Sequence, residues 1–275
     1  MQSKMTAVLR LFVLSPALLL IPGMPAVAQE TATIGPRLHL PMKFHGLRPD
    51  NSVDSENWSG YAVTGSSFTQ VTGSWIVPAV NCSSAGNTYS AFWVGIDGYS
   101  SSSVEQTGTE SDCSGESPVY YAWYEFYPHP SIVIQSLPVS PGDVVQAEVS
   151  YSGGEFTISI SDVTTGKSYS KSAKVADAKR TSAEWIAEAP CCTGRGAKGA
   201  SLPLADFGTV SFGLDYTGFS GTNNATAGAS GGSTPISGFS TAEAITMVTA
   251  KGVDEAVPAP LTADGSSFTV TWKSK

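Results

Sequence analysis

Short runs in which apolar and polar residues alternate follow one another from residue 57 to the end of the chain, without a long helical pattern. The runs favour Val, Thr, Tyr, Phe and Trp, and Gly, Ser, Asn or Asp stand between them, as is typical of antiparallel strands joined by turns. They read WSGYAVT, FTQVTGSWIVP, SAFWVGIDG, SVEQTGT, VYYAWYEFYP, DVVQAEVSYS, EFTISISDV, SYSKSAKV, SAEWIAEA, GTVSFGLDY, AITMVT and SFTVTWK. The pattern predicts one all-β sandwich of two packed antiparallel sheets over residues 54–275.

Two connecting segments have a distinctive composition. Residues 162–169, DVTTGKSY, are expected to form a hairpin turn around Thr165 and Gly166. Residues 218–238 are dominated by Gly, Ser, Thr and Asn and are expected to form one low-complexity loop.

Three neighbouring runs each present one face that mixes aromatic and hydrogen-bonding groups, since alternate side chains of a strand share a face. The opposite rows, such as Phe92, Val94 and Ile96, are uniformly apolar and predict a core face. The mixed faces hold Trp93, Gly95, Asp97, Val104, Gln106, Gly108, Glu110, Trp123, Glu125 and Tyr127. If these strands are adjacent, their mixed faces line a groove for an extended polymer. A plain solvent face with exposed aromatic residues is the alternative.

The first residues have the pattern of a secretory signal peptide. Lys4 and Arg10 precede the apolar run LFVLSPALLLIPGM, and Ala26-x-Ala28 supplies small residues for cleavage after Ala28. A transmembrane anchor is the alternative, but the run is short and interrupted by prolines. The sequence therefore predicts a secreted protein with no membrane attachment after removal of residues 1–28.

Residues 29–53 show neither strand nor helix periodicity and are interpreted as a prosegment or linker. Residues 51–275 carry ten Lys or Arg against 21 Asp or Glu, a net charge of −11, within a total of −8. We therefore hypothesise that Arg37, Lys43 and Arg48 dock on the acidic domain and inhibit it; an extension without a role is the alternative. An acidic domain is also a poor partner for nucleic acid.

Four cysteines fit an oxidising compartment. Cys82 and Cys113 flank one candidate strand pair, so we expect them to form a disulfide. Cys191 and Cys192 then form a bridge between adjacent residues or stay free. The spacing does not resemble that of a metal site, and no metal or cofactor is expected.

Several of these runs resemble the glutamic peptidases, or eqolisins, a family of secreted endopeptidases. The matching pieces occur in order over residues 57–212: NWSGYAV, GSWIVP, FWVGIDG, EQTGTE, YYAWYEFYP, SPGD, TTGKS, SAEWIAE and LADFGTVSF. The resemblance implies a sandwich of two sheets with about seven strands each, and protein or peptide substrates. It departs from the fungal pattern at Glu110, where fungal members usually have Asp, in its cysteine positions and in the loop of residues 218–238.

By this resemblance Gln106 and Glu125 are the catalytic residues. Trp58, Trp93 and Asp97 are similar to residues of the substrate groove, and Glu184 with Trp185 belongs to an element near the site. From their positions on the mixed faces, we expect Glu110, Trp123 and Tyr127 to support the site or bind substrate.

This pair suits peptide hydrolysis in acid. An ionised Glu125 can take a proton from water and return it to the departing amine, acting as general base and then as general acid. The Gln106 amide can donate a hydrogen bond to the oxyanion, and it does not titrate. The sequence thus predicts an acid-acting, monomeric endopeptidase.

Other activities remain as alternatives. GASGG around Ser230 resembles a serine-hydrolase elbow, but it lies in low-complexity sequence, and only His129 falls within the domain as a possible base. A β-sandwich glycoside hydrolase would need two carboxylates on one groove, such as Glu125 with Glu110 or Asp97. A carbohydrate-binding protein would need only the aromatic residues. Neither of the last two requires Gln106.

Overall fold

The computed structural model describes residues 37–83, 86–192 and 199–273. The predicted signal peptide, residues 1–28, lies outside these ranges. Within them, no helix has the length and apolar character needed to cross a membrane. The elements are β1 (Phe44–Leu47), β2 (Val53–Ser55), β3 (Trp58–Thr64), β4 (Phe68–Ile76), β5 (Ala91–Ile96), β6 (Glu105–Ser114), β7 (Ser117–Phe126), β8 (Ile132–Val133), β9 (Val144–Ser152), β10 (Glu155–Asp162), β11 (Lys167–Ala173), β12 (Ser182–Glu188), β13 (Thr209–Phe212), α1 (Leu214–Thr217), β14 (Asn224–Ala227), β15 (Thr234–Pro235), η1 (Ile236–Gly238), β16 (Ala242–Val248), β17 (Asp254–Pro258) and β18 (Phe268–Trp272).

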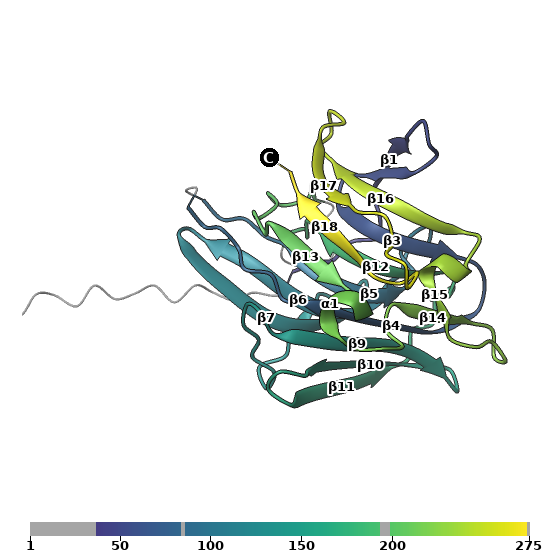
Figure 1. Ribbon diagram of the computed structural model, residues 1–275. Helices are drawn as coiled ribbons and strands as arrows, with labels where there is room; N and C mark the ends of the chain where they lie inside the picture. Colours follow the sequence, from purple (N-terminus) through teal and green to yellow (C-terminus); the bar gives the residue numbers. More distant parts are fainter. Residues whose placement is uncertain (1–36, 84–85, 193–198, 274–275) are drawn as a thin grey trace, which may run out of the picture. The chain divides into compact units, whose positions relative to one another are not determined.

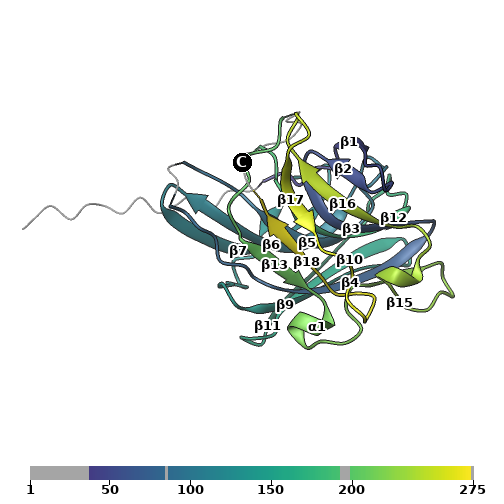
Figure 2. The ribbon, with the colours of Figure 1, turned by 45° about the horizontal axis from the view of Figure 1, so that its top comes forward.

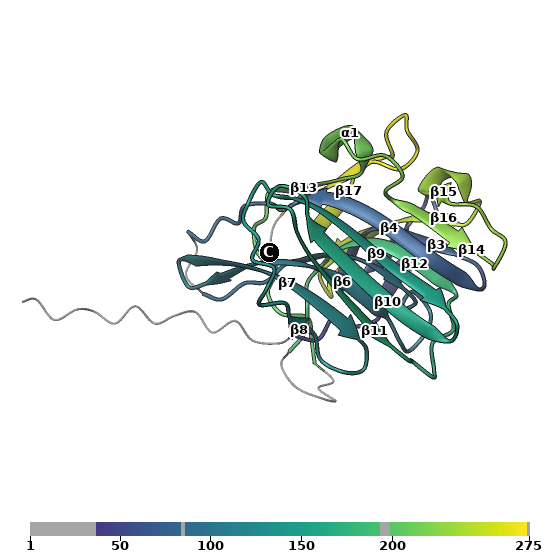
Figure 3. The same ribbon diagram turned by 90° about the horizontal axis from the view of Figure 1, so that it is seen from below.

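The strands form two layers (Figures 1 and 3). The front sheet runs β8–β7–β6–β5–β12–β3–β16–β2–β1, and only the β16–β2 pairing is parallel. The back sheet runs β11–β10–β9–β4, and β4 then pairs with both the β13–β18–β17 group and the β14–β15 hairpin. The β16–β17 hairpin links the two sheets (Figure 2). The all-β sandwich is therefore confirmed, with short strands such as β8 and β15 in addition to the expected long ones.

The main core fills the space between the sheets, and it receives the apolar rows that the sequence indicated. Phe92, Val94 and Ile96 belong to this core and are fully buried. Trp93 and Trp123 belong instead to a second apolar cluster, on the face of the front sheet that is turned away from the back sheet. We call this surface the front face. The alternation along β5 and β7 thus separates core residues from front-face residues, as predicted.

Most predicted runs are strands, and β10 and β11 are joined by the expected hairpin. Two expectations need correction. Residues 218–238 are not one loop, because they contain β14 and β15, and β14 pairs with β4. Residues 29–53 were expected to lack strands, yet β1 lies within them and β2 begins at Val53. Three of the four β1 residues are exposed, which explains why its sequence shows no apolar alternation.

The cysteines pair within their own neighbourhoods. Cys82 and Cys113 form the predicted disulfide, with their Cα atoms 5.4 Å apart. Cys191 and Cys192 are bonded to each other, which selects the first of the two possibilities left open by the sequence.

Candidate active site

Strand register brings three rows of side chains together on the front face. In the first row, Gln106 pairs with Glu125 across the β6–β7 hairpin and with Gly95 of β5, which in turn pairs with Glu184 of β12. Because directly paired residues point to the same face, the amide and the carboxyl meet: Gln106 Nε2 donates to Glu125 Oε2 at 2.7 Å. Both side chains are buried.

The second row is aromatic and the third is acidic. Gly108 stands between Trp93 and Trp123 in the register, and a Cβ atom at Gly108 would lie 2.6 Å from the Cβ of Trp93. Glycine is required there because the indole approaches the β6 backbone so closely. In the third row, Glu110 and Glu188 flank Ala91. Two carboxylates therefore stand one row away from the two tryptophans.

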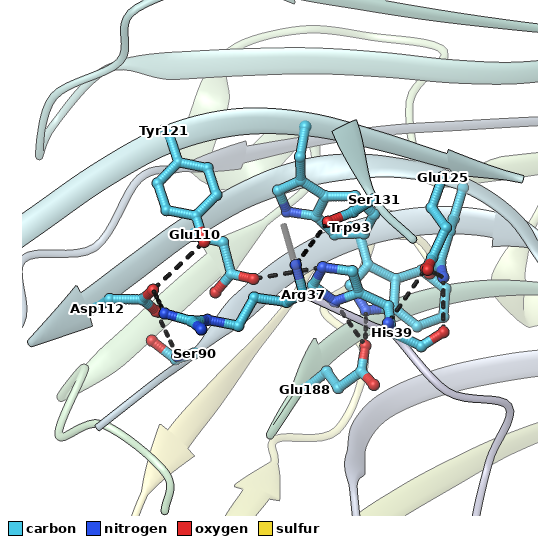
Figure 4. Close-up of polar contacts among 12 residues, drawn as sticks. Arg37, His39, Ser90, Trp93, Glu110, Asp112, Tyr121, Glu125, Ser131 and Glu188 are labelled. Carbon is cyan, nitrogen blue, oxygen red and sulfur yellow. Dashed lines mark hydrogen bonds and ion pairs between the residues drawn. The ribbon is translucent and has the colours of Figure 1, made fainter. Parts of the chain in front are cut away.

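Residues 37–43, which we call the N-terminal segment, lie on these three rows (Figure 4). The main chain of His39 contacts both members of the first row. Its carbonyl oxygen accepts from Gln106 Nε2 at 3.0 Å, and its N–H donates to Glu125 Oε2 at 3.1 Å. The predicted catalytic pair is thus engaged by a peptide of the same chain.

The His39 side chain is held by the second and third rows. Its imidazole stacks on the Trp123 indole, with centroids 3.6 Å apart and an interplanar angle of 2°. Its Nε2 lies 3.3 Å from Glu110 Oε1, and its Nδ1 lies 3.3 Å from Glu188 Oε2 (Figure 4). The ring is completely buried, so this pocket takes the whole side chain out of water.

Leu40 continues the segment onto the other side of the site. Its N–H donates to Glu188 Oε1 at 3.1 Å, and its carbonyl oxygen accepts from Trp58 Nε1 at 3.1 Å. Trp93 Nε1 donates to Glu188 Oε2 at 2.9 Å and so orients that carboxyl. The peptide bond between His39 and Leu40 therefore has its oxygen at Gln106 and its nitrogen at Glu188.

Backbone hydrogen bonds hold the segment before this peptide bond. Arg37 N–H donates to Ser131 Oγ at 3.1 Å, and Ser131 N–H donates to the Arg37 carbonyl at 3.0 Å. Leu38 N–H donates to the Cys192 carbonyl at 3.2 Å, and Cys191 N–H donates to the Leu38 carbonyl at 2.8 Å. The chain enters the site as an added strand between two edges.

Further contacts hold the segment after the bond. Met42 N–H donates to the Gly98 carbonyl at 2.9 Å, and Lys43 N–H donates to Asn57 Oδ1 at 2.7 Å. The Lys43 ammonium donates to the Gly199 carbonyl at 2.9 Å. Both flanks of the His39–Leu40 bond are therefore fixed.

Two of the three expected docking cations lie against carboxylates. Arg37 is 3.6 Å from Asp112 and stacks over Tyr89. Arg48 pairs with Asp54 at 2.6 Å and with Asp254. Lys43 instead donates to neutral oxygens, as described above.

Burial shifts the ionisation of every acid around the segment. Loss of water raises the pKa of Glu125 well above its usual value, and the charge of Glu188 adds to this shift, while hydrogen bonds from His39 and Gln106 oppose it. Burial likewise raises the pKa of Glu188, against donors that include Trp93 and Leu40. The pKa of the His39 imidazole is lowered by burial and then by Arg37. At neutral pH the ring is therefore neutral, and its contacts with Glu110 and Glu188 are hydrogen bonds.

The other sequence-predicted residues divide between the site and its surroundings. Trp58, Trp93, Glu110 and Trp123 contact the N-terminal segment or a carboxylate that does. Asp97 lies elsewhere: it accepts backbone N–H groups from residues 179–181, the loop that leads into β12. Tyr127 lies at the rim, where it helps line a cavity of about 600 Å³ that also includes His129.

Sequence reasoning missed two residues of the site. Glu188 was quoted within SAEWIAE but given no role, although it alternates onto the face of Glu184 and Ile186. His39 was set aside because it precedes the predicted domain. Strand alternation could have revealed Glu188, whereas no signal in the sequence places the His39 backbone beside Gln106. Within the described ranges no group of His, Cys, Asp and Glu has the geometry to hold a metal ion.

Comparison with known proteins identifies the class to which this fold and site belong. The profile of the Peptidase A4 family matches residues 56–272, so the chain belongs to that family, and the resemblance to the glutamic peptidases is confirmed. Aspergillopepsin-2 of Aspergillus niger is 32% identical over 197 residues, which cover 62% of this chain and 66% of that protein. Scytalidopepsin B of Scytalidium lignicola is 32% identical over 171 residues, covering 60% and 64% respectively. The chain thus matches slightly less than two thirds of each relative.

A solved structure supports the same assignment. Scytalido-glutamic peptidase, crystallised with a peptide-based transition state analogue, aligns with a TM-score of 0.64 and 26% identity. The alignment covers 79% of this chain and 98% of that one.

Proposed function

We propose that this protein is a secreted, acid-acting endopeptidase that hydrolyses peptide bonds with a water activated beside Gln106. The observation that carries the proposal is the His39–Leu40 peptide, which meets an amide donor at its oxygen and a carboxyl at its nitrogen. Those are the two groups that amide hydrolysis requires, one for the oxyanion and one for the leaving amine. A family relative that binds a peptide-based transition state analogue supports the same chemistry.

Gln106 is the oxyanion donor in this proposal. Its Nε2 already lies 3.0 Å from a substrate-like carbonyl oxygen, within the range expected of such a donor. Glu125 accepts from the same nitrogen and fixes which end of the amide faces the carbonyl. Since a glutamine does not titrate, its hydrogen bond keeps its value as the pH falls.

Two carboxylates compete for the proton transfers. The sequence prediction assigns both to Glu125, but Glu125 contacts the N–H of His39, which belongs to the preceding peptide bond. Glu188 contacts the nitrogen of Leu40, the amine that would depart when the His39 carbonyl is attacked. We therefore assign the base and acid roles to Glu188 and a positioning role to Glu125. The assignment to Glu125 remains a prediction that the same variants test.

The pKa shifts favour work in acid. Glu188 must lose a proton to activate water, and burial raises its pKa while four neighbouring groups, among them Trp93 and Lys43, lower it again. A substrate-covered carboxyl that keeps its proton at low pH is suited to return it to an amine. Buried oxygens that accept no hydrogen bond from the described residues include Gln106 Oε1 and Glu125 Oε1, and both can accept from a water.

Residues 29–53 act as an inhibitory prosegment in this proposal. The N-terminal segment covers Gln106, Glu125 and Glu188 at once, so a substrate cannot reach them while it is bound. The signal-peptide pattern of residues 1–28 and the disulfides support export to an oxidising compartment.

The test is an assay of the purified protein on denatured casein and on xylan or glucan, at acidic and neutral pH. We expect casein fragments in acid and no sugar release. Sugar release without proteolysis would reverse the choice between peptidase and glycoside hydrolase. Casein cleavage that is unaffected by Gln106→Ala would remove the proposed site.

A further inference from the structure

We propose that the chain cleaves itself between His39 and Leu40. The inference rests on the proposed peptidase function and adds to it a specific bond in this chain as the first substrate. It also identifies the His39 pocket as the subsite that receives the residue before the cleaved bond.

The orientation of this bond is the first argument. Among the contacts of the N-terminal segment, only the His39–Leu40 peptide has both its atoms at the site: its oxygen is 3.0 Å from Gln106 Nε2 and its nitrogen is 3.1 Å from Glu188 Oε1. A segment bound only as a plug could place any group there. This arrangement is instead that of a substrate whose carbonyl awaits attack.

The second argument is the way the flanks are held. Leu38 pairs with Cys191 and Cys192 on one side, while Arg37 pairs with Ser131. Leu40 is held beyond the bond by Trp58. Backbone pairing of an extended peptide is a general way to bind substrate, because it recognises the main chain at several positions on both sides of the reacting bond.

The third argument is the His39 pocket. The imidazole lies flat on Trp123, between the carboxyls of Glu110 and Glu188, and is completely buried. Such a pocket fits a planar side chain with hydrogen-bonding groups at both edges. It fixes the register of the segment, because a shift by one residue would bring Leu38 or Leu40 between two carboxyls with nothing to donate to them.

The chemical step balances with water alone. Glu188 takes a proton from water as the water oxygen bonds to the His39 carbonyl carbon, and Gln106 donates to the resulting oxyanion. The bond from that carbon to the Leu40 nitrogen then breaks, and Glu188 returns its proton to this nitrogen. The products are a fragment that ends in the His39 carboxyl and a body that begins with the Leu40 amine.

The reaction is intramolecular because the bond and the site are parts of one folded chain. After the segment, β1 and β2 return the backbone to β3, and Arg48 fastens the connection to Asp54 and Asp254. Tethering of this kind holds the substrate at the site without a diffusional encounter. The rate constant should therefore not depend on protein concentration.

The experiment uses the chain from residue 29 onward, purified at neutral pH and transferred to about pH 4, near the ordinary pKa of a glutamate. Intact mass and N-terminal sequencing follow the products, and casein digestion is measured on the same samples. We expect a fragment ending at His39 and a body starting at Leu40. The rate constant should change by less than about twofold over a hundredfold dilution, as for an intramolecular step.

Two variants identify the agent and the bond. Glu188→Gln should stay intact, with a rate lowered by about a hundredfold or more, the scale of a lost general acid–base; this excludes a contaminating peptidase. Leu40→Pro should block this cut, because proline has no N–H to donate to Glu188 and its ring restricts His39. A thermal melt checks that both variants fold, and the product map of the unaltered chain stands without either of them.

The outcomes separate the inference from the function on which it rests. A chain that digests casein while the His39–Leu40 bond stays intact overturns the inference and leaves the peptidase function standing. A rate constant that rises in proportion to concentration also overturns it, since cleavage would then occur between molecules. A chain that digests neither casein nor itself contradicts the proposed function.

Discussion

The carbonyl oxygen of His39 lies 3.0 Å from Nε2 of Gln106, although the two residues are 67 positions apart in the chain. One of them belongs to the N-terminal segment and the other to β6 in the front sheet. A main-chain carbonyl on the amide donor of the candidate site is the position expected of a substrate. The predictions below follow from this contact and from the groups that surround it.

Gln106→Ala should lower kcat on a peptide substrate by about 10²–10³-fold, the effect of removing one oxyanion donor. KM should change little, because the donor acts mainly on the charge that develops in the transition state. Steady-state kinetics at acidic pH would measure this, with circular dichroism as a check on the fold. A large rise in KM at constant kcat would instead assign Gln106 to ground-state binding.

Glu188→Gln and Glu125→Gln distinguish the two carboxylates. If Glu188 carries the proton transfers, Glu188→Gln should lower kcat by at least about a thousandfold, and Glu125→Gln by about tenfold. Both substitutions keep the shape of the side chain and its capacity to accept from Leu40 or from Gln106. The reverse order of effects in kcat would restore the sequence prediction that Glu125 is the acid–base.

His39→Ala should weaken the hold of the N-terminal segment. The substitution removes the stack on Trp123 and the contacts with Glu110 and Glu188, together worth about 2 kcal/mol. The initial rate of casein cleavage by the full chain should therefore rise by about tenfold or more. His45→Ala is the matched control, because His45 lies in β1 and contacts Glu56, outside the site. Equal initial rates for both variants would contradict an inhibitory role for His39.

The fold should lose stability as the pH rises. Burial, with the charge of Asp97, raises the pKa of Glu105 to about 9, from a usual value of 4.5. A carboxyl with a raised folded-state pKa is protonated in the native protein and releases its proton on unfolding. Its contribution is therefore complete below about pH 4.5 and declines as the pH approaches 9, by on the order of 3 kcal/mol at pH 7.

Urea denaturation at several pH values would measure that decline. Glu105→Gln should flatten the profile, since the amide releases no proton, and Glu116→Gln at an exposed position serves as control. A profile equally steep in the Glu105→Gln variant would contradict the assignment.

Asp97→Asn should destabilise the fold by about 2–4 kcal/mol, because Asp97 is buried and its carboxylate accepts from the backbone of Lys179, Arg180 and Thr181. An amide supplies only one acceptor oxygen for these donors. Thermal unfolding would measure the loss, with Asp177→Asn on the exposed neighbouring surface as control. A change under about 0.5 kcal/mol would show that the loop does not depend on this charge.

Much of the front face could be read from local pattern. The alternation in SAFWVGIDG and AWYEFYP correctly separated Trp93 and Trp123 from the core row of Phe92 and Val94, because a strand displays alternate residues on opposite faces. The same rule holds along β12, where it would have added Glu188. Asp97 shows the limit of the rule: it follows β5 at a left-handed φ of 72°, where the alternation no longer applies.

The sequence by itself determined the all-β class, the separation of core and front-face residues, the Cys82–Cys113 pairing and the family, since these depend on spacing and local composition. Only the tertiary structure decided that Glu125 and Glu188 approach Gln106 from different strands, and that His39 lies among them. Such contacts depend on strand register and on the path of the chain after residue 37. Neither can be read from periodicity, because hydrogen bonds between distant segments leave no regular trace in the order of residues.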